Sequence, residues 1–183
     1  MQVLLVSGST RGASTNTAVL RTAAVLAPSG IGTVLHEGLA TLPAFNPDDD
    51  VDPLPAPVVD LRRHVAAADA VLFCTPEYAG ALPGSFKNLL DWLVGGTEIY
   101  GKPVAWLNVS SIAAPTGGAD AHTSLAKVLG YIGATVVEPA CRRAPMTRAA
   151  VGANGTVTDP VVRRELIAAL ELLADAARHP PAA

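Results

Sequence analysis

Short runs of consecutive apolar residues alternate along the chain with longer segments in which apolar residues recur at helical spacing. The apolar runs are nearly uninterrupted, which is typical of strands buried on both faces of a parallel sheet. They lie at residues 2–7, 31–35, 70–75, 103–109 and 134–137. The segments with helical spacing lie at residues 14–27, 58–68, 83–94, 120–132 and 160–178. This alternation predicts an α/β fold in which helices flank a parallel sheet.

The composition favours one compact domain. Of the 183 residues, 50% are apolar and 16% are charged, so the chain can bury a large core and is not a disordered segment. We expect a single domain over residues 1–178 and a frayed tail at residues 179–183. Residues 38–57 are rich in proline and aspartate and are expected to form a long loop, which is either functional or mobile.

Charge and segment length exclude several classes of partner. The formal net charge is -3 and the basic pairs are scattered, so no nucleic-acid partner is expected. No secretory signal precedes the first apolar run, and the stretch without charged residues at 104–119 is too short and too polar to span a membrane. We therefore expect a soluble cytoplasmic protein without a membrane partner.

The turn after the first strand is a candidate binding site, because ligands bind beyond the carboxyl ends of strands in an open parallel sheet. Residues 7–16 (SGSTRGASTN) bring hydroxyls, an amide and the Arg11 guanidinium to a helix N-terminus, where free N–H groups favour an anion. The turn has neither GxGxxG nor GxxxxGK[ST], so a tightly held NAD or ATP is not expected. We predict a site for a terminal phosphate. The alternative is an ordinary polar loop in which Ser14 is only the N-cap.

A second candidate region follows the third strand, at residues 76–93 (PEYAGALPGSFKNLLDWL). Pro76 stiffens the strand end, and the amphipathic ring of Tyr78 suits a flat heteroaromatic ligand. The turn at 8–16 resembles the GSxRxxSxN loop of the NADPH-dependent FMN reductase family, and residues 76–93 resemble its PEYNxxxPGxxKNxxDWL signature. The resemblance extends along most of the chain.

The resemblance implies a flavodoxin-like three-layer sandwich, with a five-stranded parallel sheet in the order 2-1-3-4-5 and helices on both faces. It implies an enzyme, an FMN-dependent NAD(P)H oxidoreductase with ping-pong hydride transfer from NADPH to FMN and then to a quinone, azo, flavin or similar acceptor. FMN is then the cofactor and NADPH or NADH the co-substrate, and a homodimer or tetramer is expected. The alternatives are a flavodoxin-type FMN electron carrier and a flavin-binding protein without NADPH turnover.

By the same resemblance, the site is divided over three loops. The first turn holds the FMN phosphate, the flavin ring lies over the second turn, and the third loop closes on the other edge of the ring. No catalytic residue is expected, because FMN carries the chemistry. The predicted cofactor-binding residues are Ser9, Thr10, Arg11, Ser14, Thr15, Asn16, Pro76, Glu77, Tyr78, Ala79, Ser110, Gly117 and Gly118.

The chain departs from the family pattern at two places. Ala79 stands where the pattern has asparagine, which is expected to change substrate preference while binding survives. Residues 113–116 replace a tighter glycine-rich turn. Two readings of the following helix stay open. Lys87 and Asp91 form either a solvated i,i+4 pair or, with Trp92, part of a subunit interface beside the flavin.

The other titratable residues are assigned structural roles. Glu77 is expected to be structural or interfacial rather than a catalytic acid, and Cys74 is expected to be a packed thiol. The four histidines do not form a ligand spacing, so no metal is predicted. His122 is interpreted as an ordinary residue of a first helical turn, with a contact to the substrate or the NADPH phosphate as the alternative. No Gly-x-Ser-x-Gly elbow is present, so hydrolase chemistry is not expected.

Overall fold

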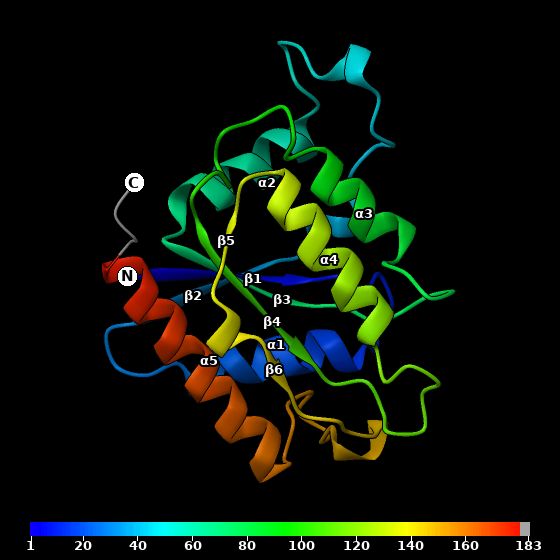
Figure 1. Ribbon diagram of the computed structural model, residues 1–183, viewed down its shortest axis with the longest axis vertical. Coiled ribbons are helices and arrows are strands. Elements are labelled where there is room, and N and C mark those ends of the chain that lie inside the picture. Colours follow the sequence, from blue (N-terminus) through cyan, green and yellow to red (C-terminus); the bar gives the residue numbers. More distant parts are fainter. Residues whose placement is uncertain (180–183) are drawn as a thin grey trace.

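The computed structural model describes residues 1–179 and has a parallel sheet between two layers of helices (Figure 1). The strands are β1 (Gln2–Ser7), β2 (Gly32–His36), β3 (Ala70–Cys74), β4 (Pro103–Asn108), β5 (Thr135–Val136) and β6 (Arg142–Arg143). The helices are α1 (Thr15–Leu26), α2 (Ala56–Ala67), α3 (Gly84–Asp91), α4 (Ala119–Tyr131) and α5 (Pro160–Arg178). Figure 1 shows α1 and α5 on one face of the sheet and α2, α3 and α4 on the other.

The strand order is β2-β1-β3-β4-β5, with every pair parallel, which confirms the predicted flavodoxin-like order. The chain leaves β1 toward β2 on one side and later returns to β3 on the other side, so the order reverses between β1 and β3. At the carboxyl edge of the sheet, Ser7 pairs with Cys74. This reversal point is where an open α/β sheet forms its ligand crevice.

The sequence predicts one strand in the fifth position of the sheet, but two short strands lie there. The start of β4 pairs with β5 (Pro103 with Thr135), and its end pairs with β6 (Asn108 with Arg143). A short 3-10 helix, η3 (Glu138–Ala140), separates the two segments. Pro139 in η3 has no N–H group to donate to β4, so the ladder is broken there. The sheet therefore has six strands, the last two being only two residues long.

Two apolar cores lie on the two faces of the sheet. Residues of β1 and β3 alternate between them: Leu5 and Leu72 pack toward α1 and α5, whereas Val6 and Phe73 pack toward α2 and α3. All four side chains are buried. Burial on both faces explains why these strands appear in the sequence as uninterrupted apolar runs. No helix within residues 1–179 has the length and apolar character needed to cross a membrane. From residue 180 on, the predicted tail lies outside the described residues.

The long loop predicted at residues 38–57 is tied to the rest of the fold by residues of the PGSFKNLLDW segment. Both the Asn88 side-chain amide and the Trp92 indole N–H donate to the Pro43 carbonyl, each at 2.9 Å. The Phe45 N–H donates to Asn88 Oδ1 at 2.7 Å. Two 3-10 turns shorten the loop, namely η1 (Gly38–Thr41) and η2 (Pro47–Asp49). Asn88 and Trp92 therefore have a structural role in this chain.

The interface reading of Trp92 is wrong, because its side chain is 0% exposed within the single chain. Its backbone carbonyl also accepts hydrogen bonds from the Arg62 guanidinium, which pairs with Asp50 at 2.8 Å. Lys87 and Asp91 do form the expected i,i+4 ion pair, with both side chains partly exposed to solvent. The end of α3 thus anchors the loop at 38–57 from inside the fold.

Candidate functional site

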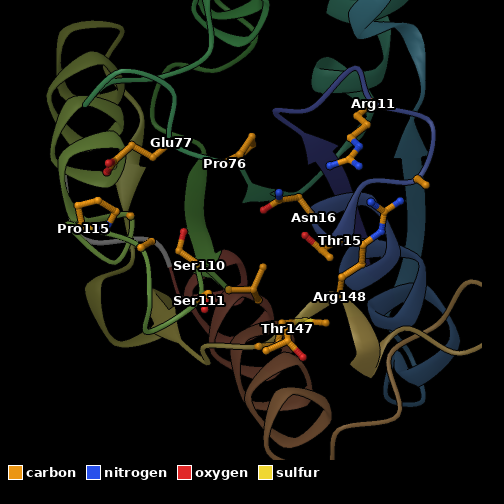
Figure 2. A pocket seen from close by; sticks show the side chains of 15 residues that line it. Arg11, Thr15, Asn16, Pro76, Glu77, Ser110, Ser111, Pro115, Thr147 and Arg148 are labelled. Atoms are coloured by element: carbon orange, nitrogen blue, oxygen red, sulfur yellow. The ribbon is translucent and has the colours of Figure 1, made fainter.

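A hollow of about 470 Å³ opens at the carboxyl edge of the sheet, where β1 and β3 end (Figure 2). Its volume lies in the range of pockets that hold small molecules and cofactors. Four segments line it: the turn after β1, the turn after β3, the loop after β4 and the residues after β6. The first three are the loops in which the sequence predicts a site, and the fourth was not predicted.

A close approach of two backbone segments shapes the first turn. The Gly8 N–H donates to the Cys74 carbonyl at 2.9 Å, and a Cβ at Gly8 would lie 2.1 Å from Thr75 Oγ1. Only glycine therefore fits where the chain leaves β1. The turn then leads into α1, whose N-cap is Ser14, with its hydroxyl accepting from the Thr17 N–H. The N-terminus of α1 is consequently directed at the hollow.

The side chains at the start of α1 are ordered by neighbours within the fold. Thr15 and Asn16 line the hollow, and Asn16 is buried. Its Oδ1 accepts a hydrogen bond from Cys74 Sγ at 3.2 Å. Burial raises the pKa of the Cys74 thiol far above its usual range, so this thiol stays protonated and available as that donor. The structure thus agrees with a packing role for Cys74.

Two arginines face the hollow from the side of α1 (Figure 2). Arg11 belongs to the turn after β1, and Arg148 begins the short helix η4 (Arg148–Ala150) beyond β6. Within residues 1–179, neither guanidinium forms an ion pair with a carboxylate. Two unpaired cations beside a helix N-terminus form a strong site for an anion. Arg148 was missed from the sequence, although its segment also follows a strand at the carboxyl edge.

The turn after β3 is a tight hairpin. Tyr78 and Ala81 exchange backbone hydrogen bonds of 3.0 and 3.1 Å around Ala79 and Gly80. Both central residues have positive φ, +51° at Ala79 and +69° at Gly80. Asn-Gly is the preferred pair in such a turn, so the family's asparagine suits the backbone here without any ligand contact. The Tyr78 side chain is 54% exposed and does not line the hollow.

Glu77 joins this turn to the loop after β4. Its carboxylate accepts hydrogen bonds from Thr116 Oγ1 at 2.6 Å, Asp120 N at 3.1 Å and Ala121 N at 3.2 Å. The Thr116 hydroxyl and the two N–H groups at the start of α4 hold the pKa of the Glu77 carboxyl below its usual range. These bonds agree with the structural role expected for Glu77, although the residue also lines the hollow.

A buried asparagine closes the loop after β4. The Asn108 side-chain amide donates to the Gly117 carbonyl at 2.9 Å, and its Oδ1 accepts from the Ser110 N–H at 3.0 Å. Gly118 has φ +81°, and a Cβ there would lie 2.4 Å from Ser110 Oγ. Sequence reasoning missed Asn108, whose signal was a polar residue at the end of an otherwise apolar strand. This residue fixes the wall of the hollow that Ser110 and Gly118 form.

The structure brings together about half of the predicted site residues. Those that line the hollow are Arg11, Thr15, Asn16, Pro76, Glu77, Ser110 and Gly118. Those that do not line it are Ser9, Thr10, Ser14, Tyr78, Ala79 and Gly117. Lining residues that were not predicted include Ser111, Met146, Thr147 and Arg148. The assignment of individual residues to FMN stays a prediction.

One histidine has the structural role expected from the sequence, and two others lie in a cluster that the sequence did not reveal. His122 is buried in the first turn of α4, and its Nδ1 lies 2.5 Å from the Gly118 carbonyl, as for an ordinary helical position. Burial lowers the pKa of His122, which keeps the ring neutral near pH 7. Although the sequence shows no ligand spacing among the histidines, the fold brings His36 and His64 together with Asp60, and the expected absence of a metal stays a prediction. Their separation in sequence hid this cluster.

Comparisons with known proteins agree with this architecture. The family model for NADPH-dependent FMN reductase matches residues 1–144. An NAD(P)H-dependent FMN reductase of Pseudomonas aeruginosa is 37% identical over 124 residues, 67% of this chain and 66% of that protein. A quinone reductase of Escherichia coli K12 is 33% identical over 140 residues, 75% of this chain and 73% of that protein.

A solved structure is similar over almost the whole length. The flavoenzyme NAD(P)H:(acceptor) oxidoreductase FerB of Paracoccus denitrificans superposes with a TM-score of 0.82 at 27% identity, covering 98% of each chain. These relatives favour the predicted class of FMN-dependent oxidoreductase over a flavodoxin-type carrier. The family model covers well over half of the chain. The chain therefore belongs to the NADPH-dependent FMN reductase family.

Proposed function

We propose that this chain binds FMN in the hollow at the carboxyl edge of the sheet and uses it to reduce quinones with electrons from NAD(P)H. The observation that carries the proposal is the pair of unpaired guanidiniums, Arg11 and Arg148, beside the N-terminus of α1. Bound FMN supplies the chemistry, by accepting a hydride from the nicotinamide and passing two electrons to a second acceptor. The protein binds, orients and shields the reactants.

The charge at the N-terminus of α1 fits a phosphate monoester. Such a group carries about -1.5 to -2 charges near neutral pH. A helix N-terminus contributes a positive charge of about +0.5, so the N-terminus of α1 and Arg11 together present a charge of only about +1.5 to the phosphate. Arg148 raises this total to about +2.5, enough to balance a dianion. Thr15 and Asn16, which line the same hollow, offer further polar groups to the phosphate and ribityl oxygens.

The opposite wall suits a flat ring. Pro76 and the Glu77 backbone border the hollow on one side, and the loop from Ser110 to Gly118 borders it on another. Because Glu77 and Asn108 anchor these two segments by five hydrogen bonds, the ring would meet a wall that is ordered before it binds. Preorganised walls cost little entropy on binding. The name of the Escherichia coli relative supports a quinone as the second acceptor.

We also propose that the protein is a cytoplasmic homodimer. Large apolar side chains are exposed at Tyr78 and Ile112 beside the hollow and at Tyr100 and Tyr131 elsewhere. Aromatic side chains of this kind are enriched in protein interfaces. Cys74 and Cys141 are free thiols, as is usual in a reducing compartment. Light scattering during gel filtration tests the dimer, and cell fractionation tests the location.

The function is tested by adding FMN to the purified protein and recording its visible spectrum, then mixing anaerobically with NADPH or NADH. We expect one FMN per chain, rapid bleaching by at least one nucleotide, and steady turnover with benzoquinone. Binding of FMN without bleaching by either nucleotide would favour the electron-carrier alternative. Failure to bind FMN would refute the proposed function.

Substitution of the two arginines tests the phosphate site. We expect Arg11→Ala and Arg148→Ala each to weaken FMN affinity about tenfold to hundredfold, because each removes a charge-assisted contact. Riboflavin, which has no phosphate, should lose much less affinity in both variants. Arg164→Ala is the matched control, since this exposed arginine lies on α5, away from the hollow. Unchanged FMN affinity in Arg11→Ala would contradict the phosphate assignment.

A further inference from the structure

Two imidazoles and a carboxylate form a compact cluster between β2 and α2. His36 is the last residue of β2, and Asp60 and His64 lie four residues apart on one face of α2. One ligand atom of each residue lies within 4.8 Å of the others. None of the three residues lines the hollow assigned to the flavin, so their geometry needs a separate explanation.

Two of the distances between ligand atoms are close to those around a tetrahedral zinc ion. His36 Nδ1 lies 3.2 Å from His64 Nδ1, and His64 Nδ1 lies 3.6 Å from Asp60 Oδ2. Zinc bonds of about 2.0–2.1 Å at tetrahedral angles separate neighbouring ligand atoms by about 3.3 Å. The cluster therefore needs only small side-chain movements to surround such an ion.

We propose that His36 Nδ1, His64 Nδ1 and a carboxylate oxygen of Asp60 bind one divalent transition-metal ion of the Zn²⁺ class. Imidazole nitrogen suits zinc, copper and nickel, whereas calcium and magnesium require sets of oxygen ligands. Three protein ligands leave the fourth tetrahedral position for water or another small ligand.

The surroundings of His36 support a neutral, metal-binding ring. His36 is 3% exposed, and burial disfavours the charged form of an imidazole. A neutral imidazole has one free lone pair, which is the form that binds a metal. Without a cation, the facing Nδ1 atoms of the two rings can share only one proton. A metal ion between them would instead use both lone pairs.

Arg63 contacts two of the proposed ligands. Its guanidinium Nη2 bonds Asp60 Oδ1, while Asp60 Oδ2 faces His64. The same guanidinium lies 3.2 Å from His64 Nε2. Metal binding at His64 Nδ1 puts a proton on Nε2, so Arg63 must turn away from that atom. Its side chain is 63% exposed and has room to do so.

The proposal is tested by isothermal titration calorimetry, in which ZnCl₂ is added to the tag-free, FMN-loaded protein in a non-chelating buffer. We expect one zinc ion per chain. His64→Ala and Asp60→Asn should each weaken zinc affinity at least about tenfold, since even outer-shell changes cost about that much. His179→Ala is the matched control, because Asp175 and His179 form the same i,i+4 pair at 3.2 Å without a third ligand among the described residues. Its zinc affinity should equal that of the unmodified protein.

Thermal unfolding gives a second measurement that does not require replacing the buried His36. Zinc should raise the unfolding midpoint of the unmodified protein and of His179→Ala, but not that of His64→Ala. Absence of one-to-one zinc binding, or equal affinity in His64→Ala, would overturn the proposal. Titration of the FMN-free protein should show the same stoichiometry. If zinc binds the FMN-loaded protein but not the FMN-free protein, the ion is bound by the cofactor, and this result would also overturn the proposal.

Discussion

Replacing Ala79 by glycine should stabilise the protein, because the backbone at this position is left-handed. Its φ of +51° lies in a region where the Cβ of an L-residue costs about 1–2 kcal/mol. Glycine avoids that cost but loses about 0.5–1 kcal/mol more backbone entropy on folding. The net gain is therefore between about 0 and 1.5 kcal/mol, with a central value of about 0.75 kcal/mol, or about 1–3 °C in the unfolding midpoint of a domain of this size. Ala79→Asn should also stabilise, since Asn-Gly suits this turn.

Denaturation in urea and by heat, with FMN absent, measures these differences directly. Ala81→Gly is the control, because Ala81 belongs to the same turn but is not among the residues with positive φ. This control should lose about 0.5–1 kcal/mol. If Ala79→Gly lost as much stability as Ala81→Gly, the argument from backbone strain would be wrong. Ala79→Asn should leave FMN affinity unchanged. The sequence also predicts that this variant has a changed preference among electron acceptors, which is measured by comparing kcat/KM for two quinones.

Three further perturbations test the contacts around the site. The unfolding free energy of the unmodified protein should exceed that of Glu77→Gln by a constant amount above pH about 4.5. This difference should decline as the pH falls through the lowered pKa of Glu77. Urea titrations of both proteins at several pH values measure it. Arg62→Met should cost about 3–5 kcal/mol of unfolding free energy, because it leaves the largely buried Asp50 carboxylate without its partner. The double variant Arg62→Met, Asp50→Leu should lose less stability, because it removes both charges. Asn88→Ala should cost about 1–3 kcal/mol and expose residues 42–50 to proteolysis, and an unchanged cleavage pattern would contradict the anchoring role.

The parts of the fold that the sequence predicts well are those in which burial sets the pattern. Four strands were located to within one or two residues, and three of them, β1, β3 and β4, are largely buried and nearly uninterrupted apolar runs, whereas the edge strand β2 is only partly buried. The apolar run at 134–137 predicts β5, whereas β6 is two arginines without an apolar pattern and owes its conformation to pairing with β4. The sequence offered Trp92 only as part of a subunit interface, and it does not reveal that the buried indole N–H bonds the Pro43 carbonyl.

The candidate site was predictable where function depends on contiguous residues. The turn at residues 7–16 holds a strand end, glycines, hydroxyls and Arg11 in one segment, so its anion-binding character was visible from the sequence. Arg148 comes from a distant segment without periodicity, and only the topology brings it to the same hollow. The cluster at His36 and His64 was missed for the same reason, because 28 positions separate the two residues and the adjacency of β2 and α2 joins them.

The interruption of the sheet at its fifth position has a consequence for solubility. A long, flat edge strand offers unpaired N–H and C=O groups on which a neighbouring molecule can polymerise. Here that margin consists of β5 and β6, two residues each, separated by Pro139 and ending in Arg142 and Arg143. A second molecule adding a strand to this edge would find no continuous ladder and would meet the charged side chain of Arg143 beside the Arg142–Glu165 ion pair. The break thus protects a largely apolar protein from edge-to-edge aggregation.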